Sequence, residues 1–303
     1  MKVVAYLSSV PAKNKNPNKP ETLKRFINGV SRTGDQGILH TGTNLVNCDV
    51  AFIQGWQHEH GKIAPHLKLR TDVTDFQRSN GNRLLVNDSN LFNYVGERPV
   101  HYGRFSFDGV FPTTGCYFWD DPDPTRWQQI SRDQGIVLKD WRQQGRHILI
   151  CTQRNGGWSM KGFDVVSWLN QTVKEIRKHT DRPIVVRPHP GDKNAKTYLN
   201  FKSMHWTLSQ NASILDDFNN AWAVITYNST PGVAASIEGI PAFVTDPVPK
   251  TSQAFGVANT DLSTIETPAM PERQAWIERL AMCHWSYDEL SSGAAWSHFK
   301  KYV

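Results

Sequence analysis

Short apolar runs recur along the chain, and most are followed by polar residues and then by helical spacing. In the first half, the runs at residues 3–8, 49–55 and 83–87 predict β-strands. A loop rich in Asn, Lys and Pro separates the first strand from a predicted helix at residues 21–30. The first half therefore begins with the strand–helix alternation that is typical of an α/β fold.

The second half repeats this order more clearly. Strands are predicted at residues 147–151, 183–187, 223–226 and 241–244, with a shorter one near Trp206, and helices at residues 163–179, 214–219 and 233–238. In the first of these helices, Val166, Leu169, Val173 and Ile176 recur close to the 3.6-residue period. This alternation predicts a parallel sheet with crossover helices.

The polar stretch at residues 143–146 lies between the two halves and predicts a domain boundary. We therefore expect an α/β protein in which two Rossmann-like domains have parallel sheets that face a central cleft. The first domain would span residues 1–144 and the second residues 145–270. Residues 271–303 are rich in Trp and Leu, and we expect them to form helices that pack back toward the first domain.

Net charge and cysteine content indicate which partners and which cellular compartment suit the protein. The 303-residue chain carries a net charge of +6 and has a pI near 9.1, which favours a polyanionic partner such as nucleic acid, an anionic glycan or a membrane surface. Four widely spaced cysteines without metal-ligand spacing indicate reduced thiols in a cytoplasmic protein. No apolar run approaches the roughly 18 residues of a membrane span, and the first residues suit a strand rather than a signal peptide.

A guanidinium and an imidazole lie two residues apart at the end of one predicted strand. Arg187 and His189 alternate with Pro188 and Pro190, which end the strand because proline cannot donate to the ladder. Both cationic groups can bind phosphate oxygens, and the carboxyl ends of strands are where α/β sheets bind ligands. The pair therefore predicts a phosphate-binding site, although a solvated Arg and a capping His at a strand exit would have the same sequence.

The next strand ends in Asn228, Ser229 and Thr230, which precede a helix. The free amides and positive dipole end of a helix bind anions, and hydroxyl groups add donors. Gly232 would let the backbone approach a ligand closely. A simple helix cap explains the same residues equally well. Glu238, about two turns further along, is a candidate partner for ribose hydroxyls.

The loop of residues 153–162 follows the first strand of the second half. It contains three glycines and two cations, and Gln153 and Arg154 at its start suit contact with a phosphate or a sugar. The loop lacks the GxGxxG spacing of a dinucleotide site and the GK[ST] ending of a P-loop. Redox cofactors and ATP hydrolysis are therefore disfavoured.

The first half has a dense set of polar and aromatic residues around Trp56, His58 and Arg104. The residues that flank Glu59 depart from H-E-x-x-H spacing, so we expect no metal. Transfer with inversion needs a carboxylate to accept a hydroxyl proton. Asp88 and Asp108 are both candidates, and Asp108, which precedes Gly109, also suits a plain turn.

A strand ending in Arg187-Pro188-His189-Pro190, followed by a strand into the Ser229-Thr230 turn and a helix ending in Glu238-Gly239, resembles the nucleotide-binding domain of GT-B fold glycosyltransferases. The resemblance covers residues 148–244. It is nearest to the His-Pro motif group, which includes bacterial sialyl-, Kdo- and capsule-linked transferases, and phage enzymes that glycosylate DNA share the two-domain plan.

The resemblance implies a role for each motif. Arg187, His189, Ser229 and Thr230 would contact the donor phosphates, and Glu238 the ribose. The sequence positions described above add Gln153, Arg154, Asn228 and Gly232 to the expected donor site, and they leave Asp88 and Asp108 as candidates for the base. The resemblance implies a nucleotide-sugar substrate, no required cofactor and no divalent metal, because fixed donors stabilise the leaving group.

The acceptor is inferred from charge. Our leading hypothesis is transfer of glucose or a pentose from a UDP-sugar to 5-hydroxymethylcytosine in double-stranded phage DNA, with Trp56, His58 and Arg104 holding a flipped-out base. The alternatives are a cytoplasmic transferase that uses CMP-Kdo or CMP-sialic acid in capsule or lipopolysaccharide synthesis, and a non-catalytic α/β protein that binds nucleic acid.

Overall fold

The computed structural model describes residues 1–13, 15–57, 64–199 and 205–303. The chain forms two compact units. Unit 1 comprises Met1–Asn90, Glu97–Gln134 and Ile277–Val303, and unit 2 comprises Leu91–Gly96 and Gly135–Trp276. The main division therefore falls at Gly135, whereas the sequence predicted that the second domain begins at residue 145. A short segment from the first half of the sequence also belongs to unit 2.

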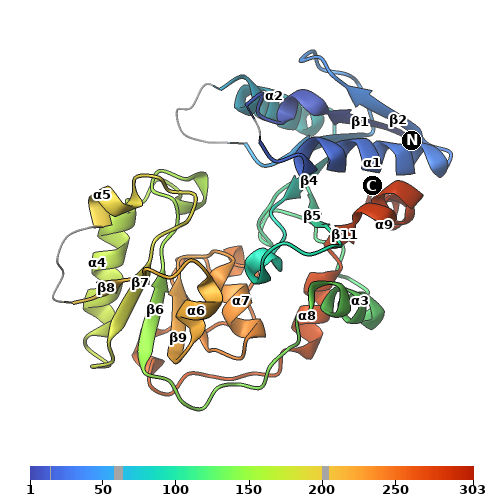
Figure 1. Cartoon of the computed structure of the whole chain (residues 1–303). Helices are drawn as coiled ribbons and strands as arrows, with labels where there is room; N and C mark the ends of the chain where they lie inside the picture. The colour runs from blue at the N-terminus through green and yellow to red at the C-terminus, as the bar shows by residue number, and fades with distance from the viewer. Residues whose placement is uncertain (14, 58–63, 200–204) are drawn as a thin grey trace. The chain divides into compact units, whose positions relative to one another are not determined.

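Unit 1 contains a six-stranded sheet in the order β11-β5-β4-β3-β1-β2 (Figure 1). Its strands are β1 (Lys2–Tyr6), β2 (Gln36–His40), β3 (Val50–Gln54), β4 (Arg83–Asp88), β5 (Tyr102–Phe107) and β11 (His284–Ser286). Strands β1 to β4 are parallel, as the sequence predicted, whereas β5 is antiparallel to β4 and β11 is antiparallel to β5. The connection from β4 to β5 carries a 3-10 turn, Asn93–Val95, in place of a crossover helix, so the chain doubles back.

The helices of unit 1 bury one face each against this sheet or against one another. They are α1 (Asn18–Arg32), α2 (Pro65–Ser79), α3 (Pro124–Gln134), α9 (Tyr287–Ser292) and α10 (Ala294–Phe299), and α8 (Gln274–Ala281) crosses the division between the units. Helix α1 buries Leu23, Phe26, Ile27 and Val30, which recur at helical spacing. Phe26 packs edge-on against Phe52 of β3 with ring centroids 4.9 Å apart.

The C-terminal segment is part of the core of unit 1. Strand β11 pairs with β5, and Trp296 and Phe299 of α10 are fully buried against Phe26. Helix α9 begins with a capping box between Ser286 and Glu289. It lies against α1 so closely that a Cβ atom on Gly29 would be 1.9 Å from the carbonyl oxygen of Leu290.

Unit 2 contains a five-stranded sheet in the order β10-β9-β6-β7-β8, and every pair is parallel. Its strands are β6 (His147–Cys151), β7 (Ile184–Arg187), β8 (Thr207–Leu208), β9 (Ala221–Thr226) and β10 (Ala242–Val244), and its helices are α4 (Val165–Ile176), α5 (Ala195–Leu199), α6 (Ile214–Phe218) and α7 (Pro231–Ile237). Each strand predicted in this half is present. Strands β6, β9 and β10 are almost wholly buried, as parallel strands covered by helices are, whereas β7 alternates between buried and partly exposed residues.

Strand order reverses once in each sheet. In unit 2 the chain moves from β6 to β7 and β8 on one side and then returns to place β9 on the other side of β6. In unit 1 it moves from β1 to β2 and then places β3 on the other side of β1. Ligands of open α/β sheets bind outside the carboxyl ends of the strands at such reversals. Functional residues are therefore expected beyond β6 and β9 in unit 2 and beyond β1 and β3 in unit 1.

Candidate functional site

The loops that follow β6, β9 and β7 lie side by side at the carboxyl edge of the second sheet, because these strands are neighbours. We call residues 152–164, 188–191 and 227–230 the second-sheet edge. It includes most of the donor residues that the sequence predicted. Thr152 joins two of the loops, since its hydroxyl donates to the carbonyl of Arg187 and accepts the backbone N–H of His189.

Gln153 and Asn228 connect the loops after β6 and β9. The buried Gln153 side chain accepts the backbone N–H of Asn228 at 3.0 Å and donates to the hydroxyl of Ser159 at 2.8 Å. The buried Asn228 side chain donates to Oδ2 of Asp246 at 2.8 Å. Both side chains therefore shape the reversal point of the sheet, and contact with a ligand would come from the residues around them.

His189 and Arg154 lie together over Gly191. The Arg154 guanidinium donates to the Gly191 carbonyl at 2.8 Å, and the Gly191 N–H donates to Nδ1 of His189 at 3.0 Å. A Cβ atom on residue 191 would be 2.7 Å from the guanidinium and 3.0 Å from the imidazole. A larger residue here would displace the guanidinium, so this tight turn gathers two of the predicted donor-binding side chains.

The hydrogen bond from Gly191 determines the form of the imidazole. Because Nδ1 accepts, the proton of the neutral ring is on Nε2. Burial, reinforced by the nearby Arg154 charge, lowers the pKa of His189 below its ordinary value, with Asp192 acting in the opposite direction. The ring is therefore set up as a neutral Nε2–H donor, which suits binding of a phosphate oxygen.

Arg187 points away from His189. Its guanidinium forms an ion pair with Asp217 and donates to the carbonyls of Asn211, Ala212 and Ser213 at 2.9–3.3 Å. The Asp217 side chain is only 1% exposed. These bonds hold the start of α6 in place and occupy the fork that the sequence assigned to a phosphate.

Ser229 and Thr230 lie at the turn between β9 and α7. The Ser229 hydroxyl is 2.6 Å from the hydroxyl of Thr226, and both Ser229 and Thr230 are partly exposed. Within the described residues the Thr230 side chain makes no cap bond to α7, so its hydroxyl is not used in the helix start. Gly232 is buried, and a Cβ atom there would be 3.2 Å from the Thr226 methyl, so its close approach is to the protein.

Glu238 lies at the other end of α7 from the Ser229–Thr230 turn. The seven-residue helix separates them by about 10 Å. The carboxylate of Glu238 forms an ion pair with Lys139 and accepts the Tyr94 hydroxyl at 3.1 Å. The structure therefore does not bring Glu238 together with His189.

In unit 1, Asp88 ends β4 on the same edge as the reversal point of the first sheet. Its carboxylate forms a 2.6 Å ion pair with the Arg104 guanidinium. Arg104 is only 5% exposed, and its guanidinium also donates to the Ser89 carbonyl and the Tyr117 hydroxyl. Arg104 is thus enclosed by protein partners. The Asp88 side chain is one-quarter exposed, so its carboxylate can still accept a proton from a group that approaches from solvent.

Arg70 of α2 organises the loops beyond β1 and β3. Its guanidinium donates to the Ser9 carbonyl at 2.8 Å and to the Trp56 carbonyl at 3.1 Å, and it packs against Gly55, whose φ is 81°. Burial lowers the pKa of Arg70 to about 10, with Asp88 opposing the shift. The Trp56 side chain is half-buried beside this arrangement. His58 lies outside the described residues.

Asp108 lies at the opposite edge of the first sheet from Asp88. Its carboxylate accepts the backbone N–H of Leu84 at 2.9 Å and forms a 2.8 Å ion pair with Arg83, at the amino end of β4. The four residues from Leu84 to Asp88 span about 13 Å. With φ at 62°, Asp108 closes the turn after β5. Asp108 therefore occupies a plain turn, which was the alternative that the sequence left open for it.

Three acidic residues bonded to or near the second-sheet edge, Asp192, Asp217 and Asp246, were not predicted from the sequence. Asp217 pairs with Arg187 from 30 residues away, and Asp192 accepts the backbone N–H of Asn155 at 2.9 Å. Lys161 forms a 3.1 Å ion pair with Asp246, which is fully buried. No motif marks these acidic residues, and only their positions beside predicted strand ends would have suggested them.

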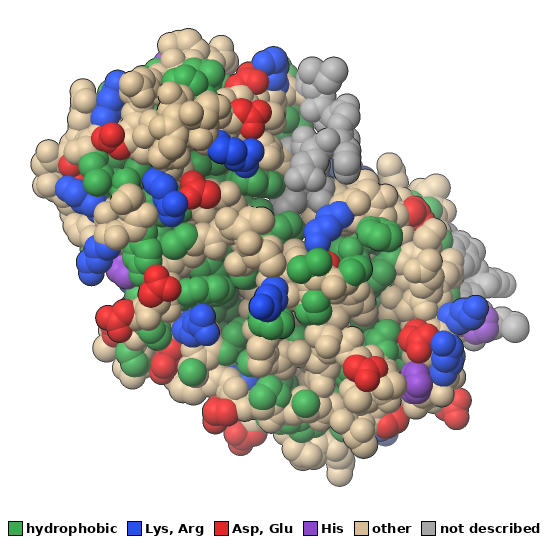
Figure 2. Space-filling model, turned by 180° about the vertical axis from the view of Figure 1, so that it is seen from behind, with side chains coloured by type: hydrophobic (Ala, Val, Ile, Leu, Met, Phe, Trp, Pro, Cys, Tyr) green, Lys and Arg blue, Asp and Glu red, His purple; other side chains and the backbone are tan. Residues whose placement is uncertain are grey.

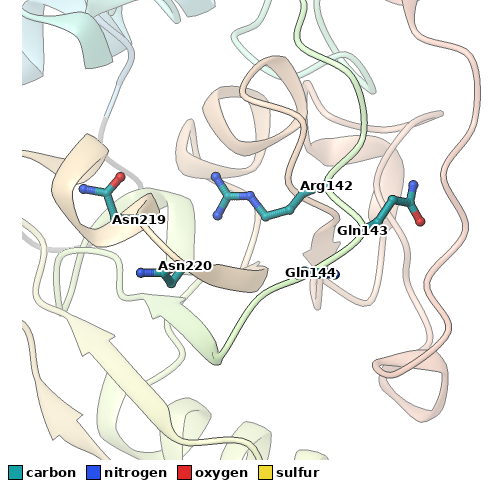
Figure 3. Close-up of a pocket in the computed structure, with 5 residues that line it drawn as sticks. All are labelled: Arg142, Gln143, Gln144, Asn219 and Asn220. Carbon is teal, nitrogen blue, oxygen red and sulfur yellow. The ribbon is translucent and has the colours of Figure 1, made fainter.

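A separate hollow in unit 2 is lined by Arg142, Gln143, Gln144, Asn219 and Asn220 (Figure 3). These residues precede β6 and β9, so the hollow lies at the amino edge of the second sheet. The Arg142 guanidinium points to the end of α6 and donates to the carbonyls of Phe218 and Ala221 at 2.6 and 2.9 Å. It is therefore used within the protein, and the hollow is not part of the second-sheet edge.

Four general features of the molecule bear on its function: surface charge, cysteines, possible metal ligands and possible membrane-spanning helices. On the face shown in Figure 2, Lys and Arg are interspersed with Asp and Glu. All four cysteines are free thiols, and three of them are buried. Within residues 1–13, 15–57, 64–199 and 205–303, no three His, Cys, Asp or Glu side chains are grouped as metal ligands. Among the same residues, no helix has the length and apolar character needed to cross a membrane.

Comparison with known proteins identifies the fold. No protein-family model and no curated protein sequence matches the chain. The solved structure of a β-Kdo 2,7-transferase region of KpsC from Thermosulfurimonas dismutans aligns with a TM-score of 0.55 and 14% identity, over 97% of this chain and 99% of that one. The β-Kdo 2,4-transferase of KpsC from the same organism aligns with a TM-score of 0.56 and 12% identity, over 93% and 90% of the two chains. The chain therefore has the GT-B fold, and the fold class predicted from the sequence is confirmed.

Proposed function

We propose that this protein is a glycosyltransferase that transfers a sugar from a nucleotide donor to a hydroxyl group. The observation that carries the proposal is the His189–Arg154 pair over Gly191, at the strand-order reversal of a GT-B nucleotide-binding sheet. This edge offers an imidazole Nε2–H, an exposed guanidinium and the hydroxyls of Ser229 and Thr230. Such a set of fixed donors fits a phosphate that gains charge as its bond to the sugar breaks.

The reaction divides into two roles. The acceptor oxygen bonds to the anomeric carbon while the bond from that carbon to the phosphate oxygen breaks, and the electron pair remains on the phosphate. His189, Arg154 and Thr230 would stabilise this charge by hydrogen bonding. Asp88 is the candidate that would accept the acceptor's hydroxyl proton, because it lies at the carboxyl edge of its sheet and is partly exposed.

For the donor we favour an acidic sugar carried on CMP, with CMP-Kdo as the first compound to test. The two KpsC structures described above, which align with TM-scores of 0.55 and 0.56, are both Kdo transferases. A CMP-linked sugar has a single phosphate, which suits the small donor set of the second-sheet edge once Arg187 is committed to Asp217. Four free thiols are compatible with a reducing cytoplasm, where we place the protein.

Transfer from a UDP-sugar to 5-hydroxymethylcytosine in DNA is the second candidate. The net charge of +6 favours it, because neutralised phosphates supply affinity for DNA. The interspersed charges in Figure 2 and the enclosed guanidinium of Arg104 add no support for a DNA-binding surface. Retention on hydroxymethylated duplex DNA at low salt is its direct test.

The donor experiment measures thermal stabilisation of the protein by CMP, UDP, CMP-Kdo and UDP-glucose in parallel, since a ligand that binds the folded state raises stability. We expect CMP and CMP-Kdo to stabilise it. His189→Ala should abolish this effect and turnover, whereas His179→Ala, a control beyond the far end of α4, should retain both. Stabilisation by UDP compounds alone would reject the CMP donor, and stabilisation by none of the four would reject the proposed function.

A further inference from the structure

Lys161 has an unusual backbone conformation at the second-sheet edge. Its φ is 50°, a left-handed value that favours glycine, and it lies between a 3-10 turn (Trp158–Met160) and Gly162, whose φ is 83°. Non-glycine residues persist in such conformations when the surrounding structure fixes them, often at ligand sites. The side-chain contacts of Lys161 show what fixes it.

The Lys161 ammonium joins the loop after β6 to the loop after β10. It donates to both carboxylate oxygens of Asp246, at 3.1 and 3.2 Å, and reaches the Thr251 hydroxyl at 3.5 Å. Asp246 is fully buried and also accepts the Asn228 side chain at 2.8 Å and the Val248 N–H at 2.8 Å. The ion pair therefore connects Lys161 to the turn that begins at Asn228.

Lys161 and Arg154 lie on opposite sides of that turn. Arg154 bonds to Gly191 after β7, whereas Lys161 bonds to Asp246 after β10, and β6 and β9 lie between these strands. Neighbouring strands are about 4.8 Å apart, so the Ser229–Thr230 turn after β9 is about one strand spacing from Asp246. The Lys161 side chain is 38% exposed, in contrast to the fully buried Asp246 carboxylate to which it bonds.

We infer that Lys161 is a specificity-determining residue that binds a second anionic group of the donor, a carboxylate on the sugar. The inference deepens the proposed function and depends on it. With the phosphate at His189 and the Ser229–Thr230 turn, a carboxylate on the same anomeric carbon would lie close to the phosphate, on the β10 side. Asp246 already neutralises part of the ammonium charge, so the remaining attraction suits a monoanion better than a second phosphate.

The test separates binding of the nucleotide from binding of the sugar. The informative variant is Lys161→Gln, because its amide can still donate to the buried Asp246 carboxylate but carries no charge. Asp246 is kept, since it also accepts the Asn228 side chain and the Val248 N–H. Lys161→Arg retains the charge and serves as the matched control. Affinities for CMP, CMP-Kdo, UMP and UDP are measured by calorimetry on each protein.

We expect Lys161→Gln to bind CMP within about twofold of wild type and CMP-Kdo roughly 10- to 100-fold more weakly, as for loss of a charged hydrogen bond. Lys161→Arg should retain most of the preference for CMP-Kdo. Equal weakening of both ligands, or of neither, would overturn the role of Lys161 while the proposed function stands. Loss of UDP affinity with UMP affinity unchanged would assign Lys161 to a second phosphate and overturn the carboxylate. If wild type binds no nucleotide, the proposed function itself fails.

Discussion

The Gly191 backbone N–H donates to Nδ1 of His189 at 3.0 Å, and this bond leaves Nε2 as the imidazole donor that faces other groups. Protonation of Nδ1 would set two N–H groups against each other. The bond therefore acts in the same direction as burial and the Arg154 charge, which lower the pKa of His189. The glycine turn and burial together therefore favour a neutral imidazole, which is the form that the proposed phosphate contact uses.

The first prediction concerns the titration of His189. Its imidazole should titrate below the ordinary value of 6.5 in the ligand-free protein. Because the unfolded chain takes up this proton at higher pH, the stability linked to His189 is complete above about pH 6.5 and is lost as pH falls through the lowered pKa. NMR titration, with His189→Gln to assign the signal, measures the midpoint. A midpoint at or above 6.5 would contradict the assigned form of the ring.

The second prediction concerns Arg187 and Asp217. Arg187→Ala should lower the free energy of unfolding by roughly 3–5 kcal/mol, since it leaves the buried Asp217 carboxylate unpaired. Urea denaturation of the purified variant measures this. Arg154→Ala, at an exposed position on the same edge, should change stability by less than about 0.5 kcal/mol.

The opposite pattern would restore the role that the sequence suggested for Arg187. If Arg187→Ala retains full stability but no longer binds CMP, then Arg187 is a donor ligand. Loss of stability together with residual CMP binding, measured at low temperature where the variant is folded, supports a structural role.

The sequence predicted local structure well because local structure depends on nearby residues. The apolar run at Ile184–Arg187 and the helical spacing in Val165–Ile176 are each contained within one element. The motif around His189 was found for the same reason, since Pro190 and Gly191 that shape its turn are its neighbours.

Pairing between residues that lie far apart in the sequence explains which side-chain roles could not be predicted from it. Arg187 was assigned to a ligand because its partner, Asp217, lies 30 residues away on another element. Glu238 was assigned to the ribose because its partners in the structure, Lys139 and Tyr94, lie 99 and 144 residues away in the sequence. Asp88 and Asp108 stayed equivalent until the antiparallel course of β5 put them at opposite edges.

The third prediction tests the close approach of α1 and α9 in unit 1. Gly29→Ala would put a Cβ atom 1.9 Å from the Leu290 carbonyl oxygen, so the helices must move apart. We expect a loss of roughly 1–3 kcal/mol of stability, as for overpacked sites. Asn28→Ala, at the exposed neighbouring position, is the control and should be close to neutral. Equal stability of the two variants by urea denaturation would show that α9 does not pack as described.

The last prediction separates the two candidate bases. Asp88 lies at the carboxyl edge of the first sheet, whereas Asp108 lies about 13 Å away along β4, bonded to Arg83 and the Leu84 N–H. Asp88→Asn removes the proton acceptor but keeps an oxygen for Arg104, so kcat should fall roughly 10²–10⁴-fold with nucleotide affinity retained. Asp108→Asn should change kcat less than about threefold, because that carboxylate closes a turn at the opposite edge.

Rates are measured with the donor and acceptor that support turnover. A large loss of kcat in Asp108→Asn with normal rates in Asp88→Asn would transfer the base to Asp108, and normal rates in both would place it elsewhere.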